Sequence, residues 1–281
     1  MDHILEMKGI EKNFSQVTVL KGVDFSVNKG EVRALVGANG AGKSTLMKIL
    51  GGVLTPNKGE IILKGKSVIF RSPGEAIDIG ISIIYQELSI VPTLTVYENV
   101  YLNRERLKHG VLDKKRMMAD YDELAKELKF EIPSNVKVST LSIANRQLVE
   151  IIKAVSIDAD IIVMDEPTTS LTEAEKEKLF ETIRHLKEKG KTIIYISHIL
   201  REIFEVADSI TVMRDGEIVG NFPKTEITQM EIAGLVMNRK MADDSESNSA
   251  NEEVRDLSEA PILLQVENIT KQGVLNNISI C

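Results

Sequence analysis

Short runs of β-branched and other apolar residues alternate with helical patterns over the first 236 residues. The runs predict β-strands, because each is rich in Val and Ile and bounded by turn residues. The expected strands are 4–7, 17–27, 32–36, 61–63, 81–85, 161–164, 192–196 and 209–213. This alternation predicts an α/β fold with a largely parallel core.

Three of the expected helices begin with a capping box, a hydroxyl residue followed three positions later by Glu. The pairs are Ser72 with Glu75, Thr95 with Glu98, and Thr172 with Glu175. The last of these helices ends at Gly190, just before strand 192–196, which predicts a βαβ crossover. From about 95 to 159 the pattern is mainly helical without a convincing strand, which predicts a helical subdomain inserted into the core.

Composition excludes several classes of protein. With 43% hydrophobic and 27% charged residues the chain can build a core, so wholesale disorder is excluded. No window approaches about 18 consecutive apolar residues, so we expect any membrane role to be peripheral. The chain begins Met-Asp-His without a secretory signal, and we expect a cytoplasmic protein. The single cysteine, Cys281, offers neither an internal disulfide nor a metal cluster.

Most of the net charge of −7 lies near the C-terminal end. Residues 241–260 hold seven acidic residues against one arginine, a sum of −6, which leaves −1 for the rest of the chain. A body so close to neutral lacks the broad basic face that nucleic-acid binding needs, so we expect no nucleic-acid partner. The acidic stretch is polar and free of aromatic residues, which predicts a linker over 237–260.

The residues after this linker resemble the start of the chain. The matched pairs are Leu5 with Leu264, Met7 with Val266, Ile10 with Ile269, Lys12 with Lys271, and, after a four-residue shortening, Val19 with Val274, Leu20 with Leu275, Val23 with Ile278 and Phe25 with Ile280. The match predicts that 261–281 begin a second, truncated copy of the domain. Chance similarity between two amphipathic strand pairs is the alternative.

A glycine-rich segment points to a nucleotide. Residues 37–45 match the phosphate-binding pattern G-x-x-x-x-G-K-[ST], between expected strand 32–36 and an expected helix from 45 to 50. Backbone N–H groups there can face a phosphate at a helix N-terminus, while Lys43 reaches the β- and γ-phosphates and Ser44 binds Mg²⁺. ATP and Mg²⁺ are therefore the expected cofactors, held by Gly37, Ala38, Asn39, Gly40, Ala41, Gly42, Lys43, Ser44 and Thr45.

Two adjacent carboxylates follow the buried run 161–164. Such a strand delivers Asp165 and Glu166 to the edge of the sheet where ligands bind. Asp165 is expected to hold Mg²⁺, and Glu166 to orient and deprotonate the water that attacks the γ-phosphorus. Solvated loop charges are the alternative, which the phosphate loop in the same domain makes less favoured.

Together these motifs resemble the ATPase domains of ABC transporters over residues 4 to about 236. The motifs occur in the family's order, with the phosphate loop followed by Gln86, Leu141-Ser142, Asp165-Glu166 and His198. Segments 141–151, 164–172 and 195–205 look like the monosaccharide-import branch, in which two ATPase domains are fused in one polypeptide. The resemblance implies a P-loop NTPase domain over 1–236, with a RecA-like parallel core, an N-terminal antiparallel β subdomain and the helical subdomain.

The resemblance also implies roles for four residues outside the two motifs. Gln86 would touch Mg²⁺ or the attacking water, and His198 would donate to the γ-phosphate as a catalytic residue. Phe14 would stack on adenine, although a buried core phenylalanine is nearly as good a reading. Ser142 would face the nucleotide of a partner domain. Without the resemblance, the favoured interpretation of Gln86 is a solvent-exposed side chain at the end of a strand. The favoured interpretation of His198 is a structural histidine.

Two departures from the family's pattern concern the partner domain. The common Leu-Ser-Gly-Gly-Gln segment reads Leu-Ser-Ile-Ala-Asn at 141–145, and the methyl of Ala144 can hinder close backbone approach. Thr172 stands where many relatives carry Asp. We therefore expect slow turnover, or binding only, at the site built with this segment.

The resemblance implies a subunit that couples MgATP hydrolysis to import of a simple sugar. Its expected partners are transmembrane permease subunits, indirectly a sugar-binding protein, and a second ATPase domain supplied by fusion or homodimerisation. It would lie peripherally on the inner face of the cell membrane. Two alternatives stay open: a soluble ABC-type ATPase not coupled to transport, and an ATP-binding module with little turnover.

Overall fold

The computed structural model describes residues 3–86, 88–237, 266–271 and 275–280. The chain forms two compact units, Met1–Lys240 and Met241–Cys281. Within the described residues, none of the helices has the length and apolar character needed to cross a membrane.

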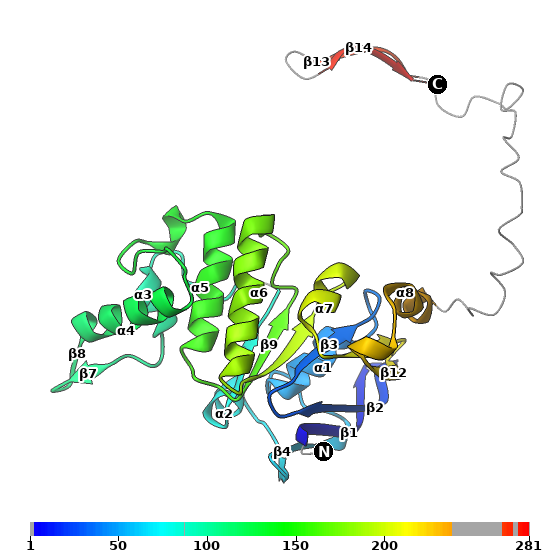
Figure 1. Ribbon diagram of the computed structural model, residues 1–281, viewed down its shortest axis with the longest axis horizontal. Coiled ribbons are helices and arrows are strands. Elements are labelled where there is room, and N and C mark those ends of the chain that lie inside the picture. Colours follow the sequence, from blue (N-terminus) through cyan, green and yellow to red (C-terminus); the bar gives the residue numbers. More distant parts are fainter. Residues whose placement is uncertain (1–2, 87, 238–265, 272–274, 281) are drawn as a thin grey trace, which may run out of the picture. The chain divides into compact units, whose positions relative to one another are not determined.

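A six-stranded sheet forms the centre of the first unit (Figure 1). The strands β6, β9, β10, β3 and β11 run parallel, and β12 pairs antiparallel with β11 at one edge. Their bounds, in sheet order, are β12 (Glu217–Pro223), β11 (Ser209–Arg214), β3 (Val32–Val36), β10 (Thr192–Ile196), β9 (Ile161–Asp165) and β6 (Ile81–Ile84). The α/β class with a largely parallel core is confirmed.

An antiparallel sheet of four strands lies at the N-terminal end of the chain, as predicted. Its order is β2 (Val17–Asn28), β1 (His3–Phe14), β4 (Lys58–Leu63) and β5 (Lys66–Val68). Helix α1 (Lys43–Leu50) buries its apolar residues in one core with this sheet and with one face of the six-stranded sheet. The short helix α2 (Pro73–Asp78) follows β5 and contributes Ala76 to that core.

The other face of the central sheet is covered by helices. Alternate strand residues point to opposite faces, so Ala34 and Val36 pack in this second core while Leu35 packs in the first. The helices that contribute to it include α5 (Ile143–Val155), α6 (Glu173–Glu188), α7 (Leu200–Val206) and α8 (Gln229–Met237). The 3₁₀ turn η2 (Lys224–Glu226) precedes α8.

The segment 95–159 is mainly helical, with α3 (Val96–Val100), α4 (Lys114–Glu127), the 3₁₀ turn η1 (Val138–Thr140) and α5. It also contains a hairpin of β7 (Leu107–Lys108) and β8 (Val111–Leu112), so the expectation of no strand here was wrong. Each strand has two residues, too few for a period-2 pattern. His109 and Gly110, at φ 52° and 80°, make the turn.

Two of the three predicted capping boxes, at Thr95 and Thr172, are present in the structure, while at Ser72 only the cap is formed and Glu75 accepts the N–H of Arg71 instead. The carboxylates of Glu98 and Glu175 accept the backbone N–H of Thr95 and Thr172, each at 2.9 Å. The N–H of Glu75 donates to the Ser72 hydroxyl at 3.4 Å. These bonds satisfy N–H groups that have no partner within their helices.

In the second unit, β13 (Val266–Lys271) pairs antiparallel with β14 (Leu275–Ile280). Three residue pairs join these two strands. The repeat matches each of them to a residue pair that joins β1 and β2. The pairs Val266–Ile280, Ile269–Ile278 and Lys271–Leu275 correspond to Met7–Phe25, Ile10–Val23 and Lys12–Leu20. The shared register supports the repeat, while the identity of 261–281 as the start of a second domain stays a prediction.

Candidate functional site

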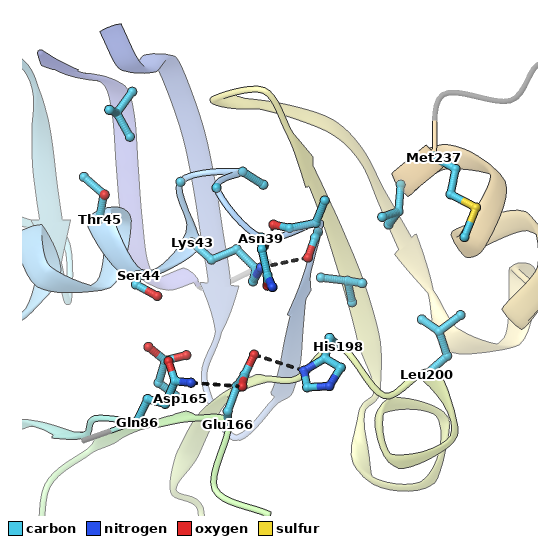
Figure 2. Close-up of a pocket in the computed structure, with 18 of the residues that line it drawn as sticks. Asn39, Lys43, Ser44, Thr45, Gln86, Asp165, Glu166, His198, Leu200 and Met237 are labelled. Carbon is cyan, nitrogen blue, oxygen red and sulfur yellow. Dashed lines mark hydrogen bonds and ion pairs between the residues drawn. The ribbon is translucent and has the colours of Figure 1, made fainter. Parts of the chain in front are cut away.

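An open cavity of about 790 Å³ lies where β3 leads into α1, at the carboxyl ends of the parallel strands (Figure 2). The loop between them and the segments after β6, β9 and β10 line it. The structure thus brings together most of the predicted site residues, namely Gly37, Ala38, Asn39, Gly40, Ala41, Gly42, Lys43, Ser44, Thr45, Gln86, Asp165, Glu166 and His198.

Two glycines of the loop have no room for a side chain. A Cβ atom at Gly37 would lie 2.2 Å from the backbone oxygen of Met213. Gly42 has a φ of 105°, and a Cβ there would lie 2.7 Å from side-chain atoms of Leu20 and Met213. The loop can therefore pack against β11 and turn into α1 only with glycine at these positions.

Lys43 begins α1 and is 7% exposed. Its ammonium group donates to the backbone oxygens of Gly37 at 2.7 Å and Ala38 at 3.0 Å. Burial lowers the pKa of Lys43, and the negative charges of Glu166 and Asp165 oppose that effect. An ammonium has three donors, so one N–H beyond these two bonds can serve a ligand in the cavity.

Asp165 ends the buried strand β9 and is 5% exposed. Burial raises the pKa of this carboxyl, while a hydrogen bond from the Ser44 hydroxyl lowers it and the neighbouring Glu166 raises it. Figure 2 shows the Ser44 hydroxyl and the Asp165 carboxylate on the same side of the cavity. These oxygen atoms, with the amide of Gln86 nearby, are the type of ligand that Mg²⁺ prefers.

Glu166 adopts a left-handed backbone conformation, with φ 50°. Its Oε1 atom lies 3.1 Å from Nδ1 of His198, and its Oε2 atom accepts a 3.5 Å hydrogen bond from Nε2 of Gln86 (Figure 2). Its backbone N–H donates to Ile196 at 2.9 Å. A non-glycine residue in this region is strained, and such strain is concentrated at functional sites.

Phe14 and Ser142 do not line this cavity. Phe14 ends β1 and is 44% exposed, with the Lys12 ammonium 5.4 Å from the centre of its ring. Ser142 caps α5, and its hydroxyl accepts the N–H of Asn145 at 3.1 Å. Their proposed contacts with adenine and with a partner's nucleotide stay predictions.

Apolar residues outside every motif form another part of the cavity wall. They come from β2, β3, α7 and α8 and comprise Val19, Val36, Leu200, Ala233, Val236 and Met237. No local pattern distinguishes them from core residues, because only the tertiary fold brings α8 to the loop. The His198–Glu166 contact, over 32 positions, is likewise invisible in the sequence.

Among the described residues, no group of three or more His, Cys, Asp or Glu side chains is arranged to hold a metal ion. A magnesium ion in this cavity would therefore need oxygen atoms of the nucleotide and water as well as Ser44 and Asp165. Mg²⁺ commonly keeps several waters and binds through one or two carboxylates plus phosphates. The residues present fit that mode of binding.

Sequence comparison identifies relatives of the whole chain. A family model described as ABC transporter matches residues 20–169. A putative ribose/galactose/methyl galactoside import ATP-binding protein of Burkholderia lata is 41% identical over 282 aligned residues, covering 99% of this chain and 52% of that protein. A ribose import ATP-binding protein of Caldanaerobacter subterraneus is 41% identical, covering 99% and 55%. The chain spans about half the length of these curated relatives.

Solved structures share the fold. A nucleotide-free ATP-binding cassette from an ABC transporter matches with a TM-score of 0.73 and 27% identity, covering 84% of this chain and 95% of that one. A dimeric cassette in a post-hydrolysis state, bound to ADP and Pi, matches with a TM-score of 0.69 and 25% identity, covering 78% and 98%. These likenesses confirm the predicted P-loop NTPase fold.

Proposed function

The chain belongs to the ABC transporter family, and on that premise we propose that it binds and hydrolyses MgATP to drive import of a monosaccharide. The observation that carries the ATPase proposal is the convergence of Lys43, Asp165 and Glu166 on one cavity. The names of the relatives, which are import proteins for ribose or galactose and methyl galactoside, support the sugar as cargo.

The phosphate loop binds the triphosphate. Its backbone N–H groups surround the phosphates, and the free donor of Lys43 reaches the β- and γ-phosphates. Because Lys43 is already held by two loop carbonyls, its ammonium needs little reorganisation when the nucleotide arrives. Phe14 would stack on the adenine ring from the tip of the β1–β2 hairpin.

Ser44, Asp165 and Gln86 would hold Mg²⁺. The ion, when bound, neutralises charge on the β- and γ-phosphate oxygens. Burial in this cavity makes a bare Asp165 carboxylate costly, as its raised pKa indicates, so a cation beside it is favoured. The Ser44 hydroxyl already lies against that carboxylate.

Glu166 activates the water. Its carboxylate accepts a proton from the water as the oxygen bonds to the γ-phosphorus and the bond to the β-phosphate oxygen breaks, leaving ADP and phosphate. Gln86 and His198 contact the two carboxylate oxygens of Glu166 and orient it. His198 would also donate to the γ-phosphate once nucleotide is bound.

The remaining parts of the transporter are separate. Transmembrane permease subunits, fed by a sugar-binding protein, would carry the sugar, and this chain would lie on the inner face of the membrane against them. A second ATPase domain, fused or from a second copy, would place its equivalent of Ser142 on the nucleotide. We assign 1–236 to the ATPase domain, with its helical subdomain at about 95–159, 237–260 to an acidic linker and 261–281 to the start of a second domain.

Exchange of one oxygen for nitrogen tests the ATPase proposal. Glu166→Gln keeps the size of the side chain but removes the proton acceptor, so we expect MgATP binding to persist and steady-state phosphate release to fall on the order of 10²- to 10⁴-fold. Titration calorimetry measures the first and a phosphate-release assay the second. Equal phosphate release by Glu166→Gln and the unaltered chain would refute the role of Glu166, and an unaltered chain that binds MgATP without turnover would favour a binding module.

A further inference from the structure

A buried carboxylate lies behind the cavity, among residues that do not line it. Glu202, in the first turn of α7, is 4% exposed. Its Oε2 atom accepts hydrogen bonds from the hydroxyls of Thr168 at 2.8 Å, Tyr195 at 3.1 Å and Ser197 at 3.2 Å. Its Oε1 atom lies 3.4 Å from the ammonium of Lys176. A buried carboxylate is tolerated only with such partners, because its desolvation costs several kcal/mol.

Two of the hydroxyl partners of Glu202, Thr168 and Ser197, belong to the segments that carry the proposed catalytic groups Glu166 and His198. Thr168 follows Glu166 by two positions, and Ser197 directly precedes His198. Local bonds reinforce each segment. The Thr169 hydroxyl donates to the backbone oxygen of Glu166 at 2.9 Å, and the Ile199 N–H donates to the Ser197 hydroxyl at 3.0 Å. One carboxylate therefore joins the turn after β9 to the end of β10.

We propose that Glu202 is a positioning residue that holds Glu166 and His198 at their observed separation. The inference rests on the proposed ATPase function. Glu202 acts through Thr168 and Ser197, and it does not line the cavity. The contact that it preserves is the 3.1 Å approach of Glu166 to His198 (Figure 2).

The chemistry of the contacts favours positioning over simple stabilisation. An apolar residue of similar size would fill this space at less desolvation cost, and replacing buried ion pairs in that way is often neutral or stabilising. Hydrogen bonds to a charged acceptor are shorter and stronger than neutral ones and are directional. They suit a place where a strained residue, Glu166 at φ 50°, must be kept in one orientation.

Two substitutions at Thr168 separate hydrogen bonding from packing. Thr168→Val keeps the shape of the side chain and removes the hydroxyl that donates to Glu202. Thr168→Ser keeps the hydroxyl and removes a methyl group. If the network positions Glu166, the serine variant retains most of kcat and the valine variant does not. If Thr168 matters only by filling space, the order is reversed.

Two tyrosines provide a matched pair for the same comparison. Tyr195 and Tyr121 are both fully buried, and each hydroxyl donates one hydrogen bond. Tyr195 donates to Glu202 at 3.1 Å, and Tyr121 donates to the backbone oxygen of Ile132 at 2.9 Å. Tyr195→Phe and Tyr121→Phe therefore remove the same hydroxyl group from two fully buried positions. Tyr121 lies in the helical subdomain on α4, away from the network.

The purified chain of 281 residues is assayed for phosphate release at saturating and varied MgATP, with the melting temperature of each variant. We expect Thr168→Val and Tyr195→Phe to lower kcat about 10- to 100-fold, since small misplacements of reacting groups have such effects, with KM for MgATP changed less than about twofold. Tyr121→Phe should also lower the melting temperature but leave kcat unchanged. Loss of kcat in Tyr121→Phe, or full kcat in Thr168→Val, would overturn the proposal.

A second measurement tests the role of Glu202 without an ATPase assay. It remains informative if the unaltered chain does not hydrolyse ATP, an outcome that would count against the proposed function but not against the positioning role. Hydrogen exchange is followed in peptides that cover 166–169 and 197–199. We expect both to exchange faster in Thr168→Val, since either segment loses its shared anchor, and to stay slow in Thr168→Ser and Tyr121→Phe. Unchanged exchange at 197–199 in Thr168→Val would show that Glu202 does not link the segments.

Discussion

The ammonium group of Lys43 is held by the backbone of its own loop. Two of its donors are bonded to Gly37 and Ala38, and burial lowers its pKa against the pull of Asp165 and Glu166. An added phosphate would bring further negative charge to this buried cation. The interaction is therefore stronger than it would be at a surface lysine.

Removal of this cation is the sharpest test at the residue scale. We expect Lys43→Ala to weaken MgATP binding on the order of 10- to 100-fold, because hydrogen bonds to charged groups contribute about 1.5–3 kcal/mol each. Titration calorimetry gives the affinity. Lys66→Ala, which removes an exposed lysine from β5, is the control and should bind as the unaltered chain does. Unchanged affinity of Lys43→Ala would contradict the proposed site.

The sequence predicted the individual residues of the site better than their contacts. Lys43 and Asp165 lie in contiguous patterns whose strand and helix surroundings are themselves readable, so their convergence could be expected. The left-handed conformation of Glu166 and its contact with His198 could not be expected from the sequence. Both depend on how the ends of β9 and β10 lie beside each other. The exposure of Phe14 depends in the same way on the length of the β1–β2 hairpin.

Helix α5 connects the segment after Gln86 to the residue proposed to face a partner's nucleotide. Midway along α5, the backbone N–H of Ser89 lowers the pKa of the buried Glu150 carboxyl, against the larger effect of burial. The Lys153 ammonium donates to the backbone oxygen of Ser89 at 3.0 Å. The backbone of Ser89 is thus held by the helix that begins after Ser142.

Glu150 gives this contact a dependence on pH. Burial raises the pKa of Glu150 above its ordinary value of about 4.5, with Lys153 and the Ser89 N–H opposing. The folded chain then binds the proton more readily than the unfolded chain, so the free energy of unfolding falls as pH rises through this window. The penalty is complete above the raised pKa and absent below about 4.5.

Glu150→Gln removes the titrating group and leaves a carbonyl that can accept the Ser89 N–H. We expect the variant to be more stable than the unaltered chain at neutral pH, with an advantage that shrinks as pH falls towards about 4.5. Urea unfolding at several pH values measures it. Glu123→Gln makes the same change at an exposed site on α4 and should show no such trend. An advantage that grows on acidification would contradict the assignment.

At the scale of the whole molecule, the sequence predicts long elements well and short ones poorly. The five parallel strands are buried runs with clear boundaries, whereas β7 and β8 are two residues each and leave no periodic signal. The repeat at the C-terminal end could be detected because apolar spacing persists where identity does not. The pairing of β13 with β14 follows that spacing position by position.

The proposed nucleotide cavity lies within one unit, and Ser142 does not line it. The proposed mechanism therefore includes a second ATPase domain, which would bring its own equivalent of Ser142 to the nucleotide. In a symmetric dimer, each site would combine the Lys43 of one copy with the Ser142 of the other. Mixing two inactive variants tests that arrangement. Ser142→Asp keeps a good helix cap, and its negative charge would repel the partner's phosphate.

A mixture of Lys43→Ala and Ser142→Asp chains forms some dimers with one intact site, since one chain supplies Lys43 and the other Ser142. We expect phosphate release to return to roughly a quarter of the unaltered level under random pairing, and to rise with protein concentration. Lys43→Ala mixed with Glu166→Gln is the control, because both changes lie on the same side of the site and no intact site can form. Recovery in that control, or none in the first mixture, would show that the second copy does not complete the site.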